Sequence, residues 1–233
     1  MKLKYRPIPT RLVFQDSHYK HVFGGPPKHT GTIPKDSAVS LHHVLSLDLA
    51  DPFVPFESDN NLSIVPLYYP LLYGFGGGEA QYKVISDTEI ELLYVCDSDK
   101  PDTDEDYPYM DEFPQRSFSL KQFSYEEFRA FLISEQAPCY DESAEDKRLL
   151  NGLTRGLVQI GGPIFPIQGA IKWECRNSEC KWHQKPATLR VFARVATAIQ
   201  DMTPMFGELS DDVEIYFGLC KMCKTIVTVN RCT

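Results

Sequence analysis

Two close pairs of cysteines constrain the fold of this 233-residue chain more than any other feature of its sequence. One pair has the spacing C-x4-C and the other C-x2-C. Each pair follows a short segment of strand character, 171–174 or 213–219, and precedes chain that can return as a strand. Two hairpin tips that each offer two thiolates are the plan of a zinc ribbon. The four residues that we expect to meet in one tetrahedral site are Cys175, Cys180, Cys220 and Cys223.

We expect the metal to be Zn2+ and its role to be structural, because four protein ligands leave no open coordination position for catalysis. Basic residues flank both pairs and favour thiolate over thiol. One alternative stays open: His183 lies three residues after Cys180 and offers a nitrogen in place of one sulfur. A redox role for the C-x2-C pair is disfavoured, because no βαβ pattern surrounds it. The flanking bases are Lys172, Arg176, Lys181, Lys221 and Lys224.

The rest of the chain is typical of the α+β class, with mostly antiparallel sheets and few short helices. Ser124 and Glu127 form a capping box that predicts a helix over 124–136, and a shorter helix is expected over 142–151. Strands outnumber helices. Besides the two segments before the cysteine pairs, strands are predicted at 44–49, 82–85, 89–96, 188–198 and 225–229.

We expect a single domain over residues 1–233, with a zinc-ribbon-like element over 171–233. A short echo suggests internal duplication: Phe23-Gly24-Gly25-Pro26-Pro27 resembles Ile160-Gly161-Gly162-Pro163-Ile164. The scattered histidines of the first 30 residues are expected at the surface or in turns.

The net charge of −8 is unevenly distributed. Residues 97–112 hold eight acids and one base, whereas the segments 1–50 and 171–233 are net basic. An acidic stretch interleaved with aromatic residues suits a surface for a basic protein partner and argues against binding of nucleic acid. The residues expected to contact such a partner are Asp102, Asp104, Glu105, Asp106, Tyr107, Tyr109, Asp111 and Glu112.

The N-terminus has no apolar h-region, so no signal peptide is expected. The longest weakly charged stretch, 62–78, is interrupted by Pro66 and Pro70 and does not predict a membrane span. We therefore expect a cytoplasmic protein, where cysteines are kept reduced or bind metals. The sequence has no G-x-S-x-G, H-E-x-x-H or Walker motif, which lowers the expectation of an enzyme.

The segments GGPP (24–27), LHHVLSLDLAD (41–51) and GGPIFPIQ (161–168) resemble the YwqG-like family of bacterial proteins of unknown function. In that family a Gly-Gly-x-Pro turn precedes a strand of the type leucine-x-glutamine-x-aspartate-leucine, and Ser46 stands here where the glutamine is usual. The resemblance implies one α+β domain with an internally duplicated sheet arrangement. It brings no agreed catalytic residues, so none is assigned.

The sequence thus predicts a non-enzymatic, zinc-stabilised protein-binding module. Family members often look like accessory proteins of bacterial operons, which favours an immunity or antitoxin-type protein that masks a basic toxin through the acidic surface. A general adaptor using the same surface is the first alternative. The second is a hydrolase or transferase with a cleft near the Gly-Gly-Pro turns.

Overall fold

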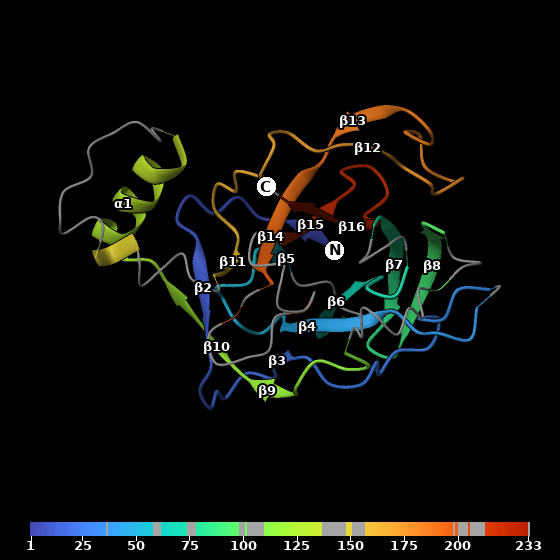
Figure 1. Ribbon diagram of the computed structural model, residues 1–233, viewed down its shortest axis with the longest axis horizontal. Helices are drawn as coiled ribbons and strands as arrows, with labels where there is room; N and C mark the ends of the chain where they lie inside the picture. The colour runs from blue at the N-terminus through green and yellow to red at the C-terminus, as the bar shows by residue number, and fades with distance from the viewer. Residues whose placement is uncertain are drawn as a thin grey trace.

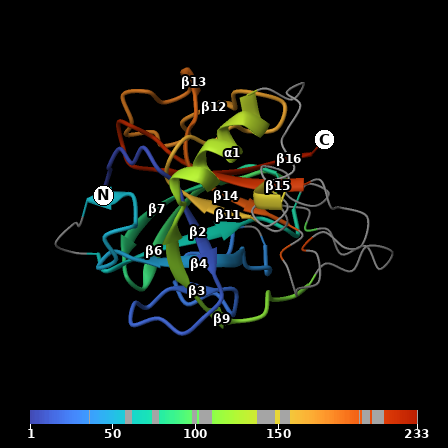
Figure 2. The same ribbon diagram turned by 90° about the vertical axis from the view of Figure 1, so that its left-hand side faces the viewer.

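Two antiparallel β-sheets stacked face to face form the body of the molecule (Figures 1 and 2). Figure 2 shows three tiers: the hairpin of β12 and β13 above, an eight-stranded sheet in the middle, and a four-stranded sheet below. The computed structural model describes residues 1–35, 37–57, 62–73, 78–97, 101, 110–136, 148–150, 157–197, 199, 205 and 213–232.

The eight-stranded sheet combines strands from both ends of the chain. In spatial order they are β10 (Ser119–Gln122), β2 (Thr10–Val13), β11 (Val158–Ile160), β14 (Arg190–Ala196), β15 (Val213–Leu219), β16 (Ile226–Cys232), β7 (Ala80–Ser86) and β8 (Glu89–Val95).

The remaining strands form one four-stranded sheet and two two-stranded ribbons. The four-stranded sheet contains β6 (Ile64–Tyr69), β4 (His42–Asp48), β3 (Val22–Phe23) and β9 (Arg116–Ser117), and the ribbons pair β1 (Lys2–Leu3) with β5 (Phe56–Glu57) and β12 (Lys172–Glu174) with β13 (Pro186–Thr188). All these strand pairs are antiparallel, as the sequence predicts.

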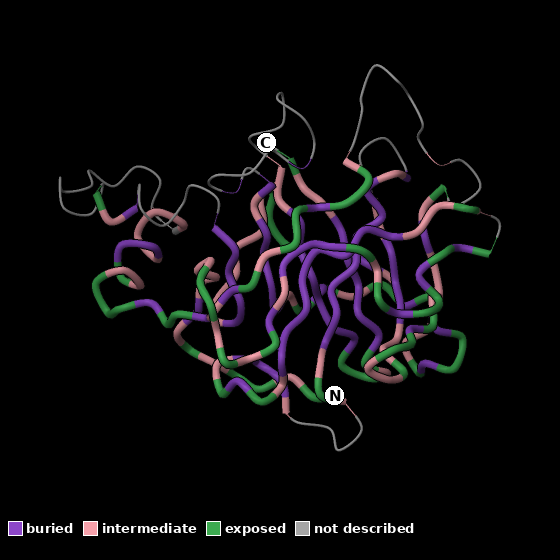
Figure 3. Tube along the Cα trace, turned by 90° about the horizontal axis from the view of Figure 1, so that it is seen from below, coloured by how far each residue is buried: buried purple, intermediate pink, exposed green. Residues whose placement is uncertain are grey.

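Alternation along the strands divides the interior into two cores. In β15, Ile215 and Phe217 point into the main core between the two large sheets, whereas Tyr216 points to the other face, toward β12 and β13. Figure 3 shows the buried strands running through the centre of the molecule, with exposed loops around the rim. The second, smaller core contains the cysteine pairs, so the candidate site lies against the outer face of the eight-stranded sheet.

The helix α1 (Tyr125–Gln136) begins where the capping box predicts. The Ser124 amide donates to the Glu127 carboxylate at 2.7 Å, and the Glu127 amide donates to the Ser124 hydroxyl at 3.1 Å. Residues 148–150 are helical and lie inside the second predicted helix, whose other residues are outside the described part of the chain. In the described residues no helix has the length and apolar character needed to cross a membrane.

Two runs of four strands share one arrangement. The order β9-β3-β4-β6 in the smaller sheet matches β2-β11-β14-β15 in the larger one. A Gly-Gly pair follows β3 and another follows β11, and the first glycine of each donates its amide to the neighbouring long strand: Gly24 to Val44 at 2.9 Å, and Gly161 to Phe192 at 2.7 Å. In both long strands the accepting residue lies at a β-bulge.

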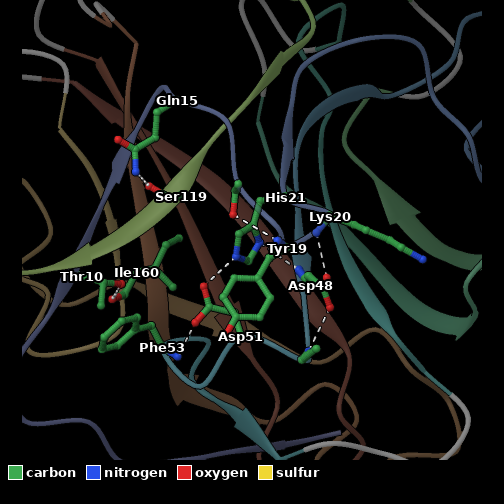
Figure 4. A network of polar contacts seen from close by, with 12 residues as sticks. Thr10, Gln15, Tyr19, Lys20, His21, Asp48, Asp51, Phe53, Ser119 and Ile160 are labelled. Carbon is green, nitrogen blue, oxygen red and sulfur yellow. Dashed lines mark hydrogen bonds and ion pairs between the residues drawn. The ribbon is translucent and has the colours of Figure 1, made fainter.

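The N-terminal histidines differ from expectation. His18 is exposed, but His21 and His29 are buried. His21 accepts a hydrogen bond at Nδ1 from the Asp48 amide, so Nε2 carries the hydrogen and donates to Asp51 at 2.8 Å (Figure 4). These bonds join the start of β3 to the end of β4. Local sequence patterns do not reveal these hydrogen bonds, because the partners are about 30 residues apart in the chain.

Candidate metal centre

Two hairpin tips place the four cysteines around a common point, as the sequence predicts. Cys175 and Cys180 lie in the loop that joins β12 to β13, and Cys220 and Cys223 lie in the tight turn that joins β15 to β16. The second hairpin belongs to the eight-stranded sheet and the first packs on it through Trp173. Each loop is therefore fixed by its own strand pair. The four cysteine side chains meet between the two loops.

The sulfur positions suit a tetrahedral metal ion. All four sulfurs lie within 4.8 Å of one another, with Cys175 and Cys223 at 3.5 Å and Cys180 and Cys220 at 3.8 Å. Zn–S bonds of about 2.3 Å give tetrahedral S···S edges of about 3.8 Å, whereas a disulfide requires about 2.0 Å. The six cysteines in the described part of the chain are free thiols. The four sulfurs could therefore hold a metal ion, and their separations are too long for a disulfide.

Hydrogen bonds from backbone amides fix the conformation of each cysteine loop. The Gln184 amide donates to the Cys175 carbonyl at 2.9 Å, and the Trp182 amide donates to the Cys180 sulfur at 3.3 Å. In the other turn the Cys220 amide donates to the Thr225 carbonyl at 2.8 Å. Amide donors directed at sulfur stabilise a thiolate and lower the cost of assembling four of them.

Gln81 attaches the first tip to the sheet, and no sequence motif indicated it. Its side-chain amide lies fully buried and donates to the Glu174 carbonyl at 2.7 Å, while its oxygen accepts from the Arg176 amide at 2.9 Å. The side chain thus pairs with the backbone on both sides of Cys175. The contact spans 93 residues of sequence, which is why local patterns do not reveal it.

Cys175, Cys220 and Cys223 differ in their readiness to ionise. Burial raises the pKa of Cys175 and also that of Cys220, the latter to about 11. At Cys223 burial acts in the same direction, but hydrogen bonds from Thr225 and Asn177 outweigh it and lower the pKa to about 6. Cys223 is therefore the thiolate most ready to receive a cation. Binding at Cys175 and Cys220 must displace protons.

His183 lies beside the cluster but is not part of it. His183 forms an isolated backbone β-bridge with Cys175, and its amide donates to the Cys180 carbonyl at 2.9 Å. The group of ligand atoms within 4.8 Å consists of the four sulfurs alone. Histidine replacement of a cysteine, the alternative left open by the sequence, has no support from this geometry.

The remaining sequence-predicted residues are placed only in part. Asp102, Asp104, Glu105, Asp106, Tyr107 and Tyr109 lie outside the described residues. Asp111 and Glu112 are described, and both are exposed. They directly precede Phe113, which is buried in the main core. Exposed carboxylates next to a fixed anchor are compatible with a contact surface, and the predicted partner site remains a prediction.

Searches against family models, curated proteins and solved structures returned no match to this chain. The assignment of the site therefore depends on its own chemistry.

Proposed function

We propose that the cysteine cluster binds one structural Zn2+ and that the chain is a non-enzymatic binding module of the cytoplasm stapled by this ion. The observation that carries the metal proposal is the approach of four thiols within 4.8 Å at two hairpin tips. Four thiolates would complete a tetrahedral shell. An ion held in this way joins the β12–β13 hairpin to the eight-stranded sheet and supplies folding energy.

The test is metal analysis of the purified protein together with cysteine variants. About one equivalent of zinc is expected, and cobalt substitution should give the intense visible absorption of a tetrahedral thiolate site. Iron in place of zinc would identify the other metal that a four-sulfur site accepts. Cys220→Ser should lose the metal and melt several degrees lower, whereas Cys232→Ser, at an exposed cysteine outside the cluster, should retain both properties. Full metal content in Cys220→Ser contradicts the proposal.

We also infer that the two matched runs of four strands are copies of one ancestral unit. Besides the shared strand order and Gly-Gly turns, a hydrogen bond recurs at the start of each long strand: the Leu41 amide donates to Thr32, and the Leu189 amide to Ile171, each at 2.9 Å. With the strands matched in this way, Tyr73 takes the place of Cys223.

The comparison of the two runs of four strands supports, by analogy, a metal ion that connects the cysteine loops. The Tyr73 hydroxyl donates to the Val39 carbonyl at 2.5 Å and contacts the Ser37 hydroxyl at 2.8 Å. It therefore joins the turn after β6 to the loop before β4. In the other half the corresponding loops are the two that carry the cysteines, where a metal ion would make the same connection.

For the partner we propose a basic protein that contacts the acidic segment 97–112, as an immunity or antitoxin-type protein would. The supporting observations are its net charge of −7 and the exposure of Asp111 and Glu112. A pull-down with Asp102, Asp104, Glu105 and Asp106 changed to Asn or Gln tests the assignment. Loss of the captured protein at low salt is expected, and unchanged capture would reject this surface.

The hydrolase or transferase alternative has little support around the Gly-Gly-Pro turns. A Cβ on Gly24 would lie 2.5 Å from the Pro114 carbonyl oxygen, and one on Gly162 would lie 2.7 Å from the Pro9 nitrogen. Both glycines are thus in tight backbone contact. These positions indicate packing requirements rather than room for a substrate.

A further inference from the structure

A cleft of about 640 Å3 lies beside the second cysteine turn, and Cys220 of the cluster is among its lining residues. One wall is the turn between Cys220 and Thr225, and the opposite wall is the small ribbon of β1 and β5. Arg190, at the start of β14, lines the cleft between them. A volume of this size is in the range that holds a small organic molecule.

The charges that line this cleft are opposite to the charge of the whole chain. Four cations, Lys2, Arg190, Lys221 and Lys224, surround one carboxylate, Glu57. Glu57 already pairs with Lys2 at 3.1 Å. In the described part of the structure no carboxylate pairs with Arg190 or Lys221. The cleft therefore carries a charge of +3 from its side chains in a protein of net charge −8.

A bound metal would reduce this surplus without reversing it. Zn2+ with four thiolates carries a charge of −2, which leaves +1 among the lining groups. The sulfur of Cys220 is fully buried, and Arg190 projects from a different strand. The cluster therefore neutralises the adjacent lysines only in part.

Apart from Cys220, the other lining residues are apolar. Leu3, Leu219 and Met222 line the same space, and Met222 is among the most exposed large apolar side chains of the described residues. Cations arranged around an apolar surface suit a ligand that has an anionic group and an apolar body. An inorganic anion would contact the cations and leave the apolar side chains unused.

We propose that this cleft binds a small organic anion, with a phosphate or carboxylate group held by Arg190 and Lys221 and an apolar body against Leu219 and Met222. This inference goes beyond the structural role of the metal. It does not depend on which metal occupies the cluster. Lys221 and Met222 are part of the cysteine turn, so the metal would fix one wall of the cleft and leave Arg190 unaffected.

Isothermal titration of the metal-loaded protein with phenyl phosphate tests the proposal. Saturable binding is expected, with a dissociation constant at or below about 1 mM. Phenol, which has the same ring without the charge, should bind at least about tenfold more weakly. Inorganic phosphate, which has the charge without the ring, should also bind more weakly. Equal affinity for phenol rejects an anion site, and equal affinity for inorganic phosphate rejects the apolar subsite.

Variants locate the site. Arg190→Gln lies outside the cysteine turn and should weaken phenyl phosphate binding about threefold to fivefold, and Lys221→Gln should do the same. The matched control is Lys181→Gln, which removes an exposed cation next to Cys180 but outside the cleft. Its affinity should equal that of the unmodified protein. Unchanged binding in Arg190→Gln, or an equal loss in Lys181→Gln, overturns the proposal in favour of general attraction to positive charge. Because Arg190→Gln leaves all four cysteines in place, this result is independent of the metal assignment.

Discussion

At the scale of single residues, His43 links the fold to pH. The ring donates from Nδ1 to the Gly24 carbonyl at 2.7 Å and accepts at Nε2 from the Ser46 hydroxyl at 2.7 Å. Burial lowers the pKa of His43 to about 4, with nearby Lys28 and His29 acting in the same direction. Both ring nitrogens are satisfied only when the imidazole is neutral. A proton added in the folded state breaks the bond from Ser46.

The pKa of His43 predicts the direction of a pH effect. In the unfolded chain the group titrates near pH 6.5, so between about pH 6.5 and 4 the unfolded state binds a proton that the folded state does not. Folding stability therefore falls as the pH falls through this window, by up to about 3 kcal/mol from this group. Urea unfolding from pH 7.5 to 4 should give a flatter curve for His43→Gln, and His18→Gln, at an exposed position, should keep the original slope. Parallel curves for His43→Gln and the unmodified protein would disprove the linkage.

Gln81 should matter to both stability and metal binding. In Gln81→Leu the Glu174 carbonyl and the Arg176 amide lose their buried partner, which should cost about 2–4 kcal/mol in the free energy of unfolding. The first cysteine tip loses its attachment, so zinc affinity should fall about tenfold or more in competition with a chelator. Gln15→Leu removes an exposed amide bonded to Ser119 and should change stability by less than about 0.5 kcal/mol. Metal affinity equal to that of the unmodified protein would show that the tip is fixed by other contacts.

Single residues also show what the sequence could predict. The four cysteines were identifiable because thiolate ligands occur in short, recognisable spacings and each pair follows an alternating strand. The roles of His43 and Gln81 were not, because His43 also bonds Gly24, 19 residues away, and Gln81 bonds Glu174, 93 residues away. A lone polar residue in an apolar strand has no local pattern that distinguishes a buried, bonded side chain from an exposed one.

At the scale of elements, the second Gly-Gly turn requires glycine for two reasons. Gly162 has φ +69°, and an added Cβ would lie 2.7 Å from the Pro9 nitrogen. Gly169, seven residues later, has φ +84° but open space around the Cβ position. Gly169→Ala should cost about 1 kcal/mol for the left-handed conformation alone. Gly162→Ala should cost at least about 1–2 kcal/mol more, because backbone atoms cannot rotate away. Equal thermal shifts for the two variants would contradict the tight contact.

The accuracy of the predicted elements follows from where their determinants lie. The strand β15 was predicted at its observed bounds because apolar residues occupy every second position, and β8 was predicted within a residue because it follows a polar turn at Ser86 and Asp87. The start of α1 was predicted because a capping box is local. The two-residue strands β3 and β9 could not be, because strands this short are defined by their neighbours in the sheet. The β12–β13 hairpin was only half predicted, since Pro186 gives no strand signal.

At the scale of the whole molecule, the two runs of four strands with the same order connect their loops by different chemistry. The N-terminal half uses the Tyr73 hydroxyl, which bonds Val39 and Ser37. The C-terminal half brings four thiols together. The main core does not include any of these cysteines. The sheets should therefore remain folded when a metal is removed, and the effect should be confined to one half.

Hydrogen exchange after chelation tests this asymmetry. In the metal-loaded protein the Gln184 and Lys224 amides, bonded at 2.9 and 3.1 Å to cysteine carbonyls, should be protected. Removing the metal leaves buried thiols in place of a four-fold connection, so these two amides should exchange at least about tenfold faster. The Leu41 and Tyr73 amides, which donate to the Thr32 and Pro70 carbonyls beside β4 and β6, should keep their rates. Equal acceleration in both halves would mean that the metal stabilises the whole fold rather than one pair of loops, and no acceleration at Gln184 and Lys224 would mean that the sheet alone holds the cysteine loops together.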